Sequence, residues 1–150
     1  MSEPLHIVCP HCDAVNRLAQ ERLSDQPNCG KCTRELFMAK PLDVSSARFA
    51  KHIERSDIPV LVDFWAPWCG PCRTMAPAYQ QAAQRLEPMV RLLKVDTESA
   101  PDIGGRFNIR SIPTLALFRN GREVARQAGA MDAGGIVAWT QAQLQASTSR

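Results

Sequence analysis

Beyond the first forty residues, the hydrophobic positions switch between helical and strand-like spacing. Apolar residues recur at helical spacing around Phe49, and Ser45 or Ser46 can cap this helix at its N-terminus. Residues 60–66 then form a β-branched and aromatic run that is almost continuously apolar. Such a run is typical of a strand buried on both faces of a sheet, and its one charged residue is Asp63.

The rest of the chain continues this alternation. The spacing of apolar residues predicts a helix after Cys69 to residue 86, a strand at 90–95, a helix at 99–107 capped by Ser99, a hairpin of strands 114–118 and 123–126, and a helix capped by Asp132. Asn120-Gly121 lies between the two hairpin strands and is a strong signal for a tight turn. With a weak first strand at 42–44, the pattern predicts an α/β fold with a mixed central sheet flanked by helices.

Residues 1–40 have a different character, because they contain few large apolar side chains. A segment of this size seldom folds without a metal, a disulfide or a partner. We therefore expect a small separate lobe that needs a cross-link of its own.

Composition and charge exclude several classes of protein. Hydrophobic residues make up 45% of the chain, charged residues make up 22% and the net charge is +3, which is the balance of a globular protein. The basic residues are scattered, so neither a nucleic-acid partner nor a membrane surface is expected. The first eight residues lack the apolar run of a signal peptide, and apolar stretches elsewhere are only strand-sized. A cytoplasmic location is the expectation.

Cysteines carry the most specific information, since all six occur in Cys-x-x-Cys pairs: Cys9 and Cys12, Cys29 and Cys32, Cys69 and Cys72. In a reducing compartment such thiols serve as metal ligands or redox catalysts more often than as a disulfide scaffold.

The third pair follows the buried strand and opens a helix. The helix N-terminus offers unpaired N–H groups and a partial positive charge, which stabilise Cys69 as the attacking thiolate. Cys72 lies one turn deeper, where it can resolve a mixed disulfide without meeting the substrate first. Pro71 fits the first helical turn, where its missing N–H costs nothing.

Residues 62–72, Val-Asp-Phe-Trp-Ala-Pro-Trp-Cys-Gly-Pro-Cys, resemble the active-site segment of the thioredoxin family, and residues 111–115, Ser-Ile-Pro-Thr-Leu, resemble its cis-proline loop. The resemblance extends over roughly residues 41–146 and implies a thioredoxin fold. It also implies a kink at Pro77, a cis peptide at Pro113, and a substrate-binding surface formed by Trp68, Gly70, Pro71, Ile112, Pro113 and Gly129.

The same resemblance implies that Asp63 is a buried acid beneath the cysteine pair and that Lys94 is the strand lysine beside it. Burial in an apolar strand would raise the pKa of Asp63, so it could accept the proton of Cys72. Lys94 could tune that acid, although a surface lysine with no catalytic role is an equal alternative.

The first two pairs match the Cys-x₂-Cys-x₁₅₋₂₀-Cys-x₂-Cys template of structural zinc sites. Cys9, Cys12, Cys29 and Cys32 can supply four thiolates to one Zn²⁺ in a closed tetrahedron, which would be the cross-link of the lobe. Cys9-Pro10-His11-Cys12 also matches oxidising redox centres, but it lacks a buried aromatic strand and a second cis-proline loop. His6 or His11 could replace a thiol ligand, but a solvent-facing histidine is the simpler interpretation, and His52 is expected to have no chemistry.

An N-terminal extension with two such pairs is similar to the thioredoxin-2 type of bacteria. The expected organisation is a zinc-ribbon-like lobe at residues 1–40 and a thioredoxin domain at 41–150, with one zinc ion per chain. The resemblance implies a protein-disulfide reductase that acts on protein disulfides and is itself reduced by an NADPH-dependent flavoprotein reductase.

Two other functions stay open on the sequence. The lobe could be a redox sensor or a partner-binding module whose thiolates release metal on oxidation. The cysteine pair could also serve an isomerase or an oxidase, although Gly70-Pro71 is the dipeptide of the reducing members.

Overall fold

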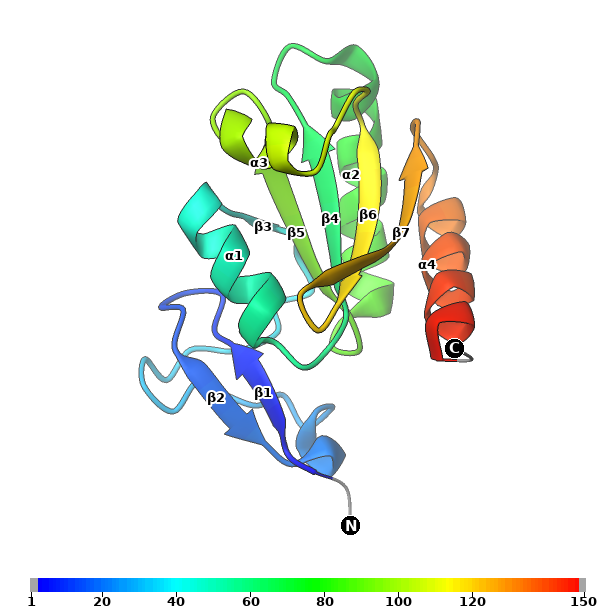
Figure 1. Cartoon of the computed structure of the whole chain (residues 1–150). Helices are drawn as coiled ribbons and strands as arrows, with labels where there is room; N and C mark the ends of the chain where they lie inside the picture. The colour runs from blue at the N-terminus through cyan, green and yellow to red at the C-terminus, as the bar shows by residue number, and fades with distance from the viewer. Residues whose placement is uncertain (1–2, 149–150) are drawn as a thin grey trace.

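The computed structural model describes residues 3–148 (Figure 1). The elements are, in chain order, β1 (Leu5–Val8), β2 (Val15–Leu18), the 3₁₀ turn η1 (Gln20–Arg22), β3 (Leu42–Asp43), α1 (Ser46–Arg55), β4 (Val60–Trp65), α2 (Gly70–Leu86), β5 (Arg91–Asp96), α3 (Pro101–Arg106), β6 (Thr114–Arg119), β7 (Arg122–Ala128) and α4 (Ala133–Thr148). No helix in the described part of the chain is long and apolar enough to cross a membrane.

Five strands form a mixed sheet in the order β3-β5-β4-β6-β7. Strands β3, β5 and β4 are parallel, whereas β6 and β7 run antiparallel to their neighbours. Asn120 and Gly121 connect β6 to β7 with φ angles of 53° and 79°, the left-handed geometry that a two-residue hairpin turn requires. The predicted α/β fold, its weak first strand and its hairpin are confirmed.

Strand β4 lies at the centre of the sheet and alternates its side chains between two cores. One core is aromatic and packs α1 and α3 on the sheet, with Phe49 in edge contact with Phe107 and Phe118. The opposite core packs α2 and α4. There the buried Tyr79 hydroxyl lies 3.1 Å from the Leu61 carbonyl and 2.8 Å from the Leu93 carbonyl. Helix α2 is thereby fixed against the middle of the sheet.

Helix ends agree with the capping signals except at α3. Ser45 caps α1 by accepting the Arg48 N–H, and Asp132 accepts the Gly135 N–H at the start of α4. Ser99 was expected to cap α3, but that expectation is wrong: the N-cap is Ala100, with no side-chain cap. The Ser99 hydroxyl instead donates to the Asp96 carboxylate at 3.0 Å.

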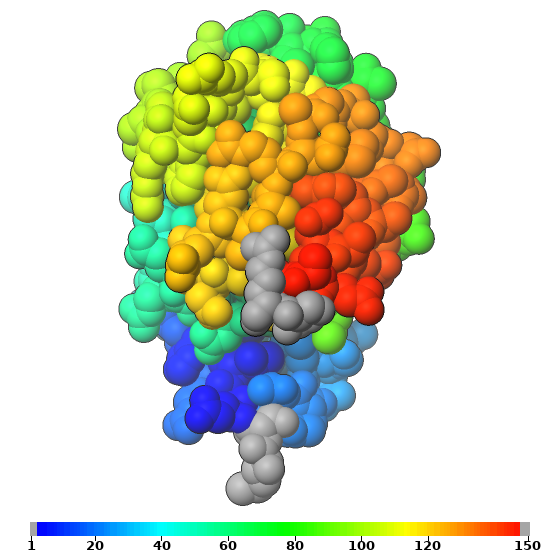
Figure 2. Space-filling model, turned by 45° about the vertical axis from the view of Figure 1, so that its right-hand side comes forward, coloured from blue at the N-terminus to red at the C-terminus, as the bar shows by residue number. Residues whose placement is uncertain are grey.

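The N-terminal lobe is built on an antiparallel hairpin of β1 and β2, which the sequence pattern did not reveal. Ile7, Leu18 and Leu36 form its small core, and Ile58 from the loop before β4 completes it. The lobe packs beneath α1, at the end of the sheet opposite the loop that joins β4 to α2 (Figure 1). The space-filling view shows the two parts in direct contact (Figure 2).

One side chain from the sheet, Arg91, anchors the lobe. It is 2% exposed, and its guanidinium donates to the carbonyls of Val8 and Leu36 in the lobe, at 3.2 and 2.8 Å. It also forms an ion pair with Glu87 at 3.1 Å, and Glu87 accepts the backbone N–H of Ala39. Because both charges are buried and bonded to each other and to the lobe, separating the two parts would expose an unpaired network.

A second polar cluster joins the lobe to α1. Asp13 receives two N–H groups from Arg48 and one contact from His52 Nε2 at 2.9 Å. Arg48 also donates to the Pro10 carbonyl at 2.8 Å. Burial lowers the pKa of His52 to about 4, so its ring is neutral near pH 7. His52 is therefore a core residue that holds the lobe.

Candidate functional site

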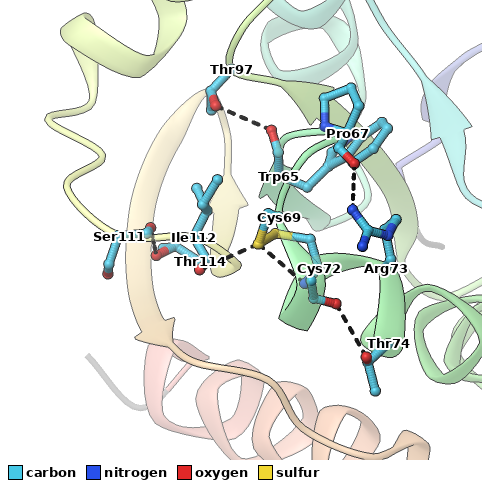
Figure 3. The surroundings of a disulfide bond; sticks show 11 residues. Trp65, Pro67, Cys69, Cys72, Arg73, Thr74, Thr97, Ser111, Ile112 and Thr114 are labelled. Carbon is cyan, nitrogen blue, oxygen red and sulfur yellow. Dashed lines mark hydrogen bonds between the residues drawn. A yellow bond between two sulfur atoms is a disulfide. The ribbon is translucent and has the colours of Figure 1, made fainter.

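The third cysteine pair lies at the junction between the central strand β4 and the long helix α2. Strand β4 ends at Trp65, and Cys69 is the N-cap of α2. Its Sγ accepts the backbone N–H of Cys72 at 3.2 Å, so the sulfur lies at the positive end of the helix (Figure 3). Cys69 and Cys72 form a disulfide, with their Cα atoms 5.2 Å apart. The two sulfurs can therefore bond without any rearrangement of the backbone.

The surroundings of the pair are mostly apolar, with one prominent side chain. Cys69 and Cys72 are buried, whereas Trp68 is 66% exposed. Trp68 and Ile112 line a shallow hollow of about 200 Å³ beside the cysteines. Cys69 Sγ lies 3.8 Å from the carbonyl oxygen of Ile112, on the neighbouring loop (Figure 3).

That neighbouring loop contains a cis peptide between Ile112 and Pro113, as the sequence predicted. The Pro113 carbonyl accepts the N–H of Gly129 at 2.9 Å, which places Gly129 beside the loop. Gly129 has φ +99°, a backbone conformation that residues with a side chain rarely adopt, and the space where a Cβ would lie is open. The loop thus places Ile112 next to Cys69, and Gly129 lies beside Pro113.

Asp63 is 1% exposed in the middle of β4, on the side of the sheet that faces α2. Burial raises the pKa of its carboxyl to about 7, and the nearby Lys94 charge partly opposes this rise. Neither carboxylate oxygen has a hydrogen-bond partner among the described residues. A buried acid that titrates near neutral pH is suited to exchange a proton with an adjacent group.

Lys94 occupies the position opposite Asp63 in the parallel pairing of β4 and β5. It makes no ion pair with that carboxylate within the described residues, because its Nζ lies over the Trp65 ring, 4.4 Å from the centroid. Its influence on Asp63 is therefore a through-space charge effect.

The other four cysteines converge in the lobe. Their Sγ atoms all lie within 4.8 Å of one another, and the Cys9–Cys32 and Cys12–Cys29 sulfurs are 3.7 Å apart. A tetrahedral zinc ion with Zn–S bonds of about 2.3 Å needs sulfurs separated by roughly 3.8 Å. The arrangement of these four sulfurs fits a closed Cys₄ zinc site.

Backbone N–H groups point at these sulfurs. The His11 N–H donates to Cys9 Sγ, and the N–H groups of Lys31 and Cys32 donate to Cys29 Sγ, at 3.3 to 3.5 Å. Burial raises the pKa of Cys29, but these N–H groups and an Asn16 amide outweigh it and lower the pKa to about 6. At Cys29 these bonds favour the thiolate form that binds metal, whereas at Cys9 burial outweighs them and raises the pKa to about 12.

Neither lobe histidine competes for the metal position in this arrangement. The His11 ring Nε2 lies 3.0 Å from the Glu35 carbonyl, and the His6 ring Nδ1 lies 2.8 Å from the Asp57 carboxylate. The group of possible ligands consists of the four cysteines alone within residues 3–148.

Two protein-family models match this chain, one over the Cys69–Cys72 pair and one over the four cysteines of the lobe. A family model described as "Thioredoxin" matches residues 40–142, and one described as "Thioredoxin 2, N-terminal" matches residues 8–34. The chain belongs to the thioredoxin family. The fold is the thioredoxin fold with a zinc-ribbon-like lobe at its N-terminus, and the chain is a thiol–disulfide oxidoreductase.

Individual thioredoxins match over different lengths. Thioredoxin C-3 of Corynebacterium nephridii is 45% identical over 139 residues, which is 93% of this chain and 95% of that protein. Thioredoxin 1 of Nostoc sp. is 44% identical over 94 residues, 63% of this chain and 88% of that protein. A crystal structure of chloroplastic thioredoxin z superposes with a TM-score of 0.64 at 26% identity, covering 71% of this chain and 96% of that one.

Sequence reasoning missed one residue that supports the cluster of four cysteines. The side chain of Asn16, in β2, donates to Cys29 Sγ at 3.4 Å and accepts the Gly30 N–H at 2.8 Å. It thereby orients one sulfur and one knuckle loop together. A single asparagine in a short strand carries no sequence signal for this role.

Proposed function

We propose that this thioredoxin is a protein-disulfide reductase in which Cys69 is the nucleophile. The observation that carries the proposal is the position of Cys69 at the N-cap of α2, where its sulfur accepts the Cys72 N–H. That position stabilises a thiolate and lies beside the exposed Trp68. Attack on a substrate disulfide requires the thiolate form of the nucleophile.

The proposed cycle moves two electrons from the protein to the substrate. The Cys69 thiolate attacks one substrate sulfur, the substrate S–S bond breaks, and one substrate thiolate leaves. The Cys72 thiol loses its proton, and its sulfur attacks Cys69 Sγ in the mixed disulfide. The second substrate thiolate leaves, both substrate thiolates take up protons, and the Cys69–Cys72 disulfide remains.

Asp63 is the proposed acceptor of the Cys72 proton, directly or through water. Its burial and its pKa of about 7 support this role, since a base is most effective when its pKa lies near the working pH. Lys94 is the proposed tuning residue, because its charge lowers the pKa that burial raises.

Substrate docking is assigned to the surface around the cysteines. We propose that it consists of Trp68, Gly70, Pro71, Ile112, Pro113 and Gly129. Support comes from the hollow that Trp68 and Ile112 share and from the open space around Gly70 and Gly129. An extended substrate backbone can approach closely where no side chain intervenes.

For the lobe we propose one structural Zn²⁺ per chain, held by Cys9, Cys12, Cys29 and Cys32. Four thiolates in a closed tetrahedron leave no open coordination position, so the ion would cross-link the two knuckles without taking part in the redox cycle. We place the boundary between the lobe, residues 1–40, and the thioredoxin domain, residues 41–150, at the chain segment that enters β3.

The proposed partners are protein disulfides and an NADPH-dependent thioredoxin reductase that restores the dithiol. Four cysteines placed for metal binding and a reducing role both suit the cytoplasm, which is the proposed location.

Insulin reduction with NADPH and thioredoxin reductase tests this function. Wild type should reduce insulin, Cys69→Ala should be inactive, and Cys72→Ser should accumulate mixed disulfides that mass spectrometry locates on Cys69. Activity in Cys69→Ala would refute the assignment of the nucleophile. Metal analysis should give about one zinc per chain, and reduced protein should retain two reactive thiols when zinc is bound.

A further inference from the structure

The surface between the lobe and the active-site helix carries a groove with unneutralised positive charge. One hollow of about 510 Å³ is lined by Lys40, Arg73 and Lys94, with Asp43 as its only acidic residue. Its floor includes Ala76 and Pro77 from the second turn of α2. The hollow therefore begins on the helix that carries the cysteine pair.

A second hollow continues this surface onto the lobe. It has a volume of about 600 Å³ and is lined by Arg34, Met38, Glu35 and again Lys40. Because Lys40 lines both hollows, they are adjacent, and together they reach from the zinc knuckles to α2. Among residues 3–148, none of Arg34, Lys40, Arg73 and Lys94 forms an ion pair.

The groove is fixed in position relative to the cysteines. Arg91 and the Asp13–Arg48 pair attach the lobe to the sheet and to α1, so the lobe wall cannot shift independently. Arg73 follows Cys69 by four residues, which is about 6 Å along the helix axis. A substrate chain advances roughly 3.3 Å per residue, so side chains two to four residues from its reactive cysteine would reach the end of the groove that Arg73 lines.

We propose that this groove binds an acidic polypeptide segment next to the disulfide of a substrate protein. The inference rests on the proposed reductase function and assigns it a substrate preference. Four cations against two acidic residues complement a run of carboxylates, and such complementarity raises the association rate and selects partners. The lobe then contributes one wall of the substrate-binding surface.

The test uses two synthetic peptides with the same disulfide ring, one followed by three glutamates and the other by three glutamines. The single-turnover rate of reduced protein with each peptide is measured at low and high salt. Wild type should reduce the glutamate peptide about fivefold to tenfold faster at low salt, and the difference should shrink at high salt.

Two variants locate the effect. In Lys40→Glu, which reverses the charge that lines both hollows, the preference should fall at least twofold, while the rate with the glutamine peptide stays within about twofold, which also shows that the protein is folded. Arg122→Glu is the matched control, because it also reverses one exposed cation and lies in the hairpin at the opposite edge of the sheet. It should keep the preference.

Equal wild-type rates for the two peptides would overturn the inference while leaving the reductase function intact. A preference that is undiminished in Lys40→Glu would also overturn it. Failure to reduce either peptide would instead contradict the proposed function on which the inference rests.

Discussion

Replacing Asp63 by asparagine should stabilise the oxidised protein at alkaline pH. Asp63 is 1% exposed, and its carboxylate lacks hydrogen-bond partners among the described residues. Burial raises its pKa from 3.8 to about 7. Ionising this side chain therefore requires more free energy in the folded state than in the unfolded state. Ionisation of Asp63 thus lowers the free energy of unfolding.

The sign and size of the effect follow from these two pKa values. Between about pH 4 and pH 7 the folded state holds a proton that the unfolded state has released, so the free energy of unfolding falls as pH rises. A difference of about 3 pKa units corresponds to about 4 kcal/mol once both states are ionised. Asp63→Asn should thus match wild type near pH 3.5 and exceed it by about 4 kcal/mol above pH 8.

Urea unfolding of both proteins at a series of pH values measures this difference. With a denaturant dependence of about 2 kcal/mol per molar, the midpoint should shift by about 2 M at pH 8.5. Glu98→Gln removes one carboxylate charge from an exposed position and serves as the control, with little expected change. A stability gain in Asp63→Asn that is the same at pH 4 and pH 8.5 would refute the reasoning.

Three further changes test other parts of the molecule. Arg91→Met should destabilise the protein by about 3–5 kcal/mol in urea unfolding, because it leaves the Glu87 carboxylate buried without its partner. Removal of zinc by a chelator should increase hydrogen exchange in residues 5–36 while reduction of the glutamine peptide stays within about twofold, since the proposed metal site lies in the lobe and the cysteine pair in the domain. Trp68→Ala should raise KM for protein disulfides about fivefold to tenfold with a smaller change in kcat, because this exposed ring belongs to the proposed docking surface.

Each of these outcomes has a clear contrary result. Adding Glu87→Gln to Arg91→Met should restore part of the lost stability, and an additive loss would contradict the ion-pair argument. Unchanged exchange in the lobe after metal removal would contradict a structural role for zinc. A Trp68→Ala enzyme with normal KM would remove this residue from the docking surface.

The sequence predicted most of the domain because its signals are local. Short apolar runs located the strands, and Asn120-Gly121 located the β6–β7 turn, because both signals depend on neighbouring residues only. Ser99 failed as a cap because Asp96, three residues earlier, offers its hydroxyl a carboxylate acceptor. A local pattern does not show which of two nearby partners a side chain chooses.

Polar contacts between residues far apart in the sequence were not predicted. Arg91 bonds to carbonyls of residues 83 and 55 positions away, and Arg48 reaches Asp13 across 35. Nothing in the spacing of either arginine distinguishes it from a solvated surface residue. The cysteine clusters were predictable because the Cys-x-x-Cys spacing itself indicates metal binding or redox activity. The attachment of the lobe depends on contacts that form only in the folded protein.

The separation of the lobe from the cysteine pair has a consequence for spectroscopy. The three tryptophans of the chain are Trp65, Trp68 and Trp139, and all lie outside residues 1–40. Intrinsic fluorescence therefore reports on the domain alone, and melting of the lobe by itself would leave the emission unchanged. Any emission change that accompanies metal loss would measure how far a disturbance in the lobe passes through Arg91 and α1 into the sheet.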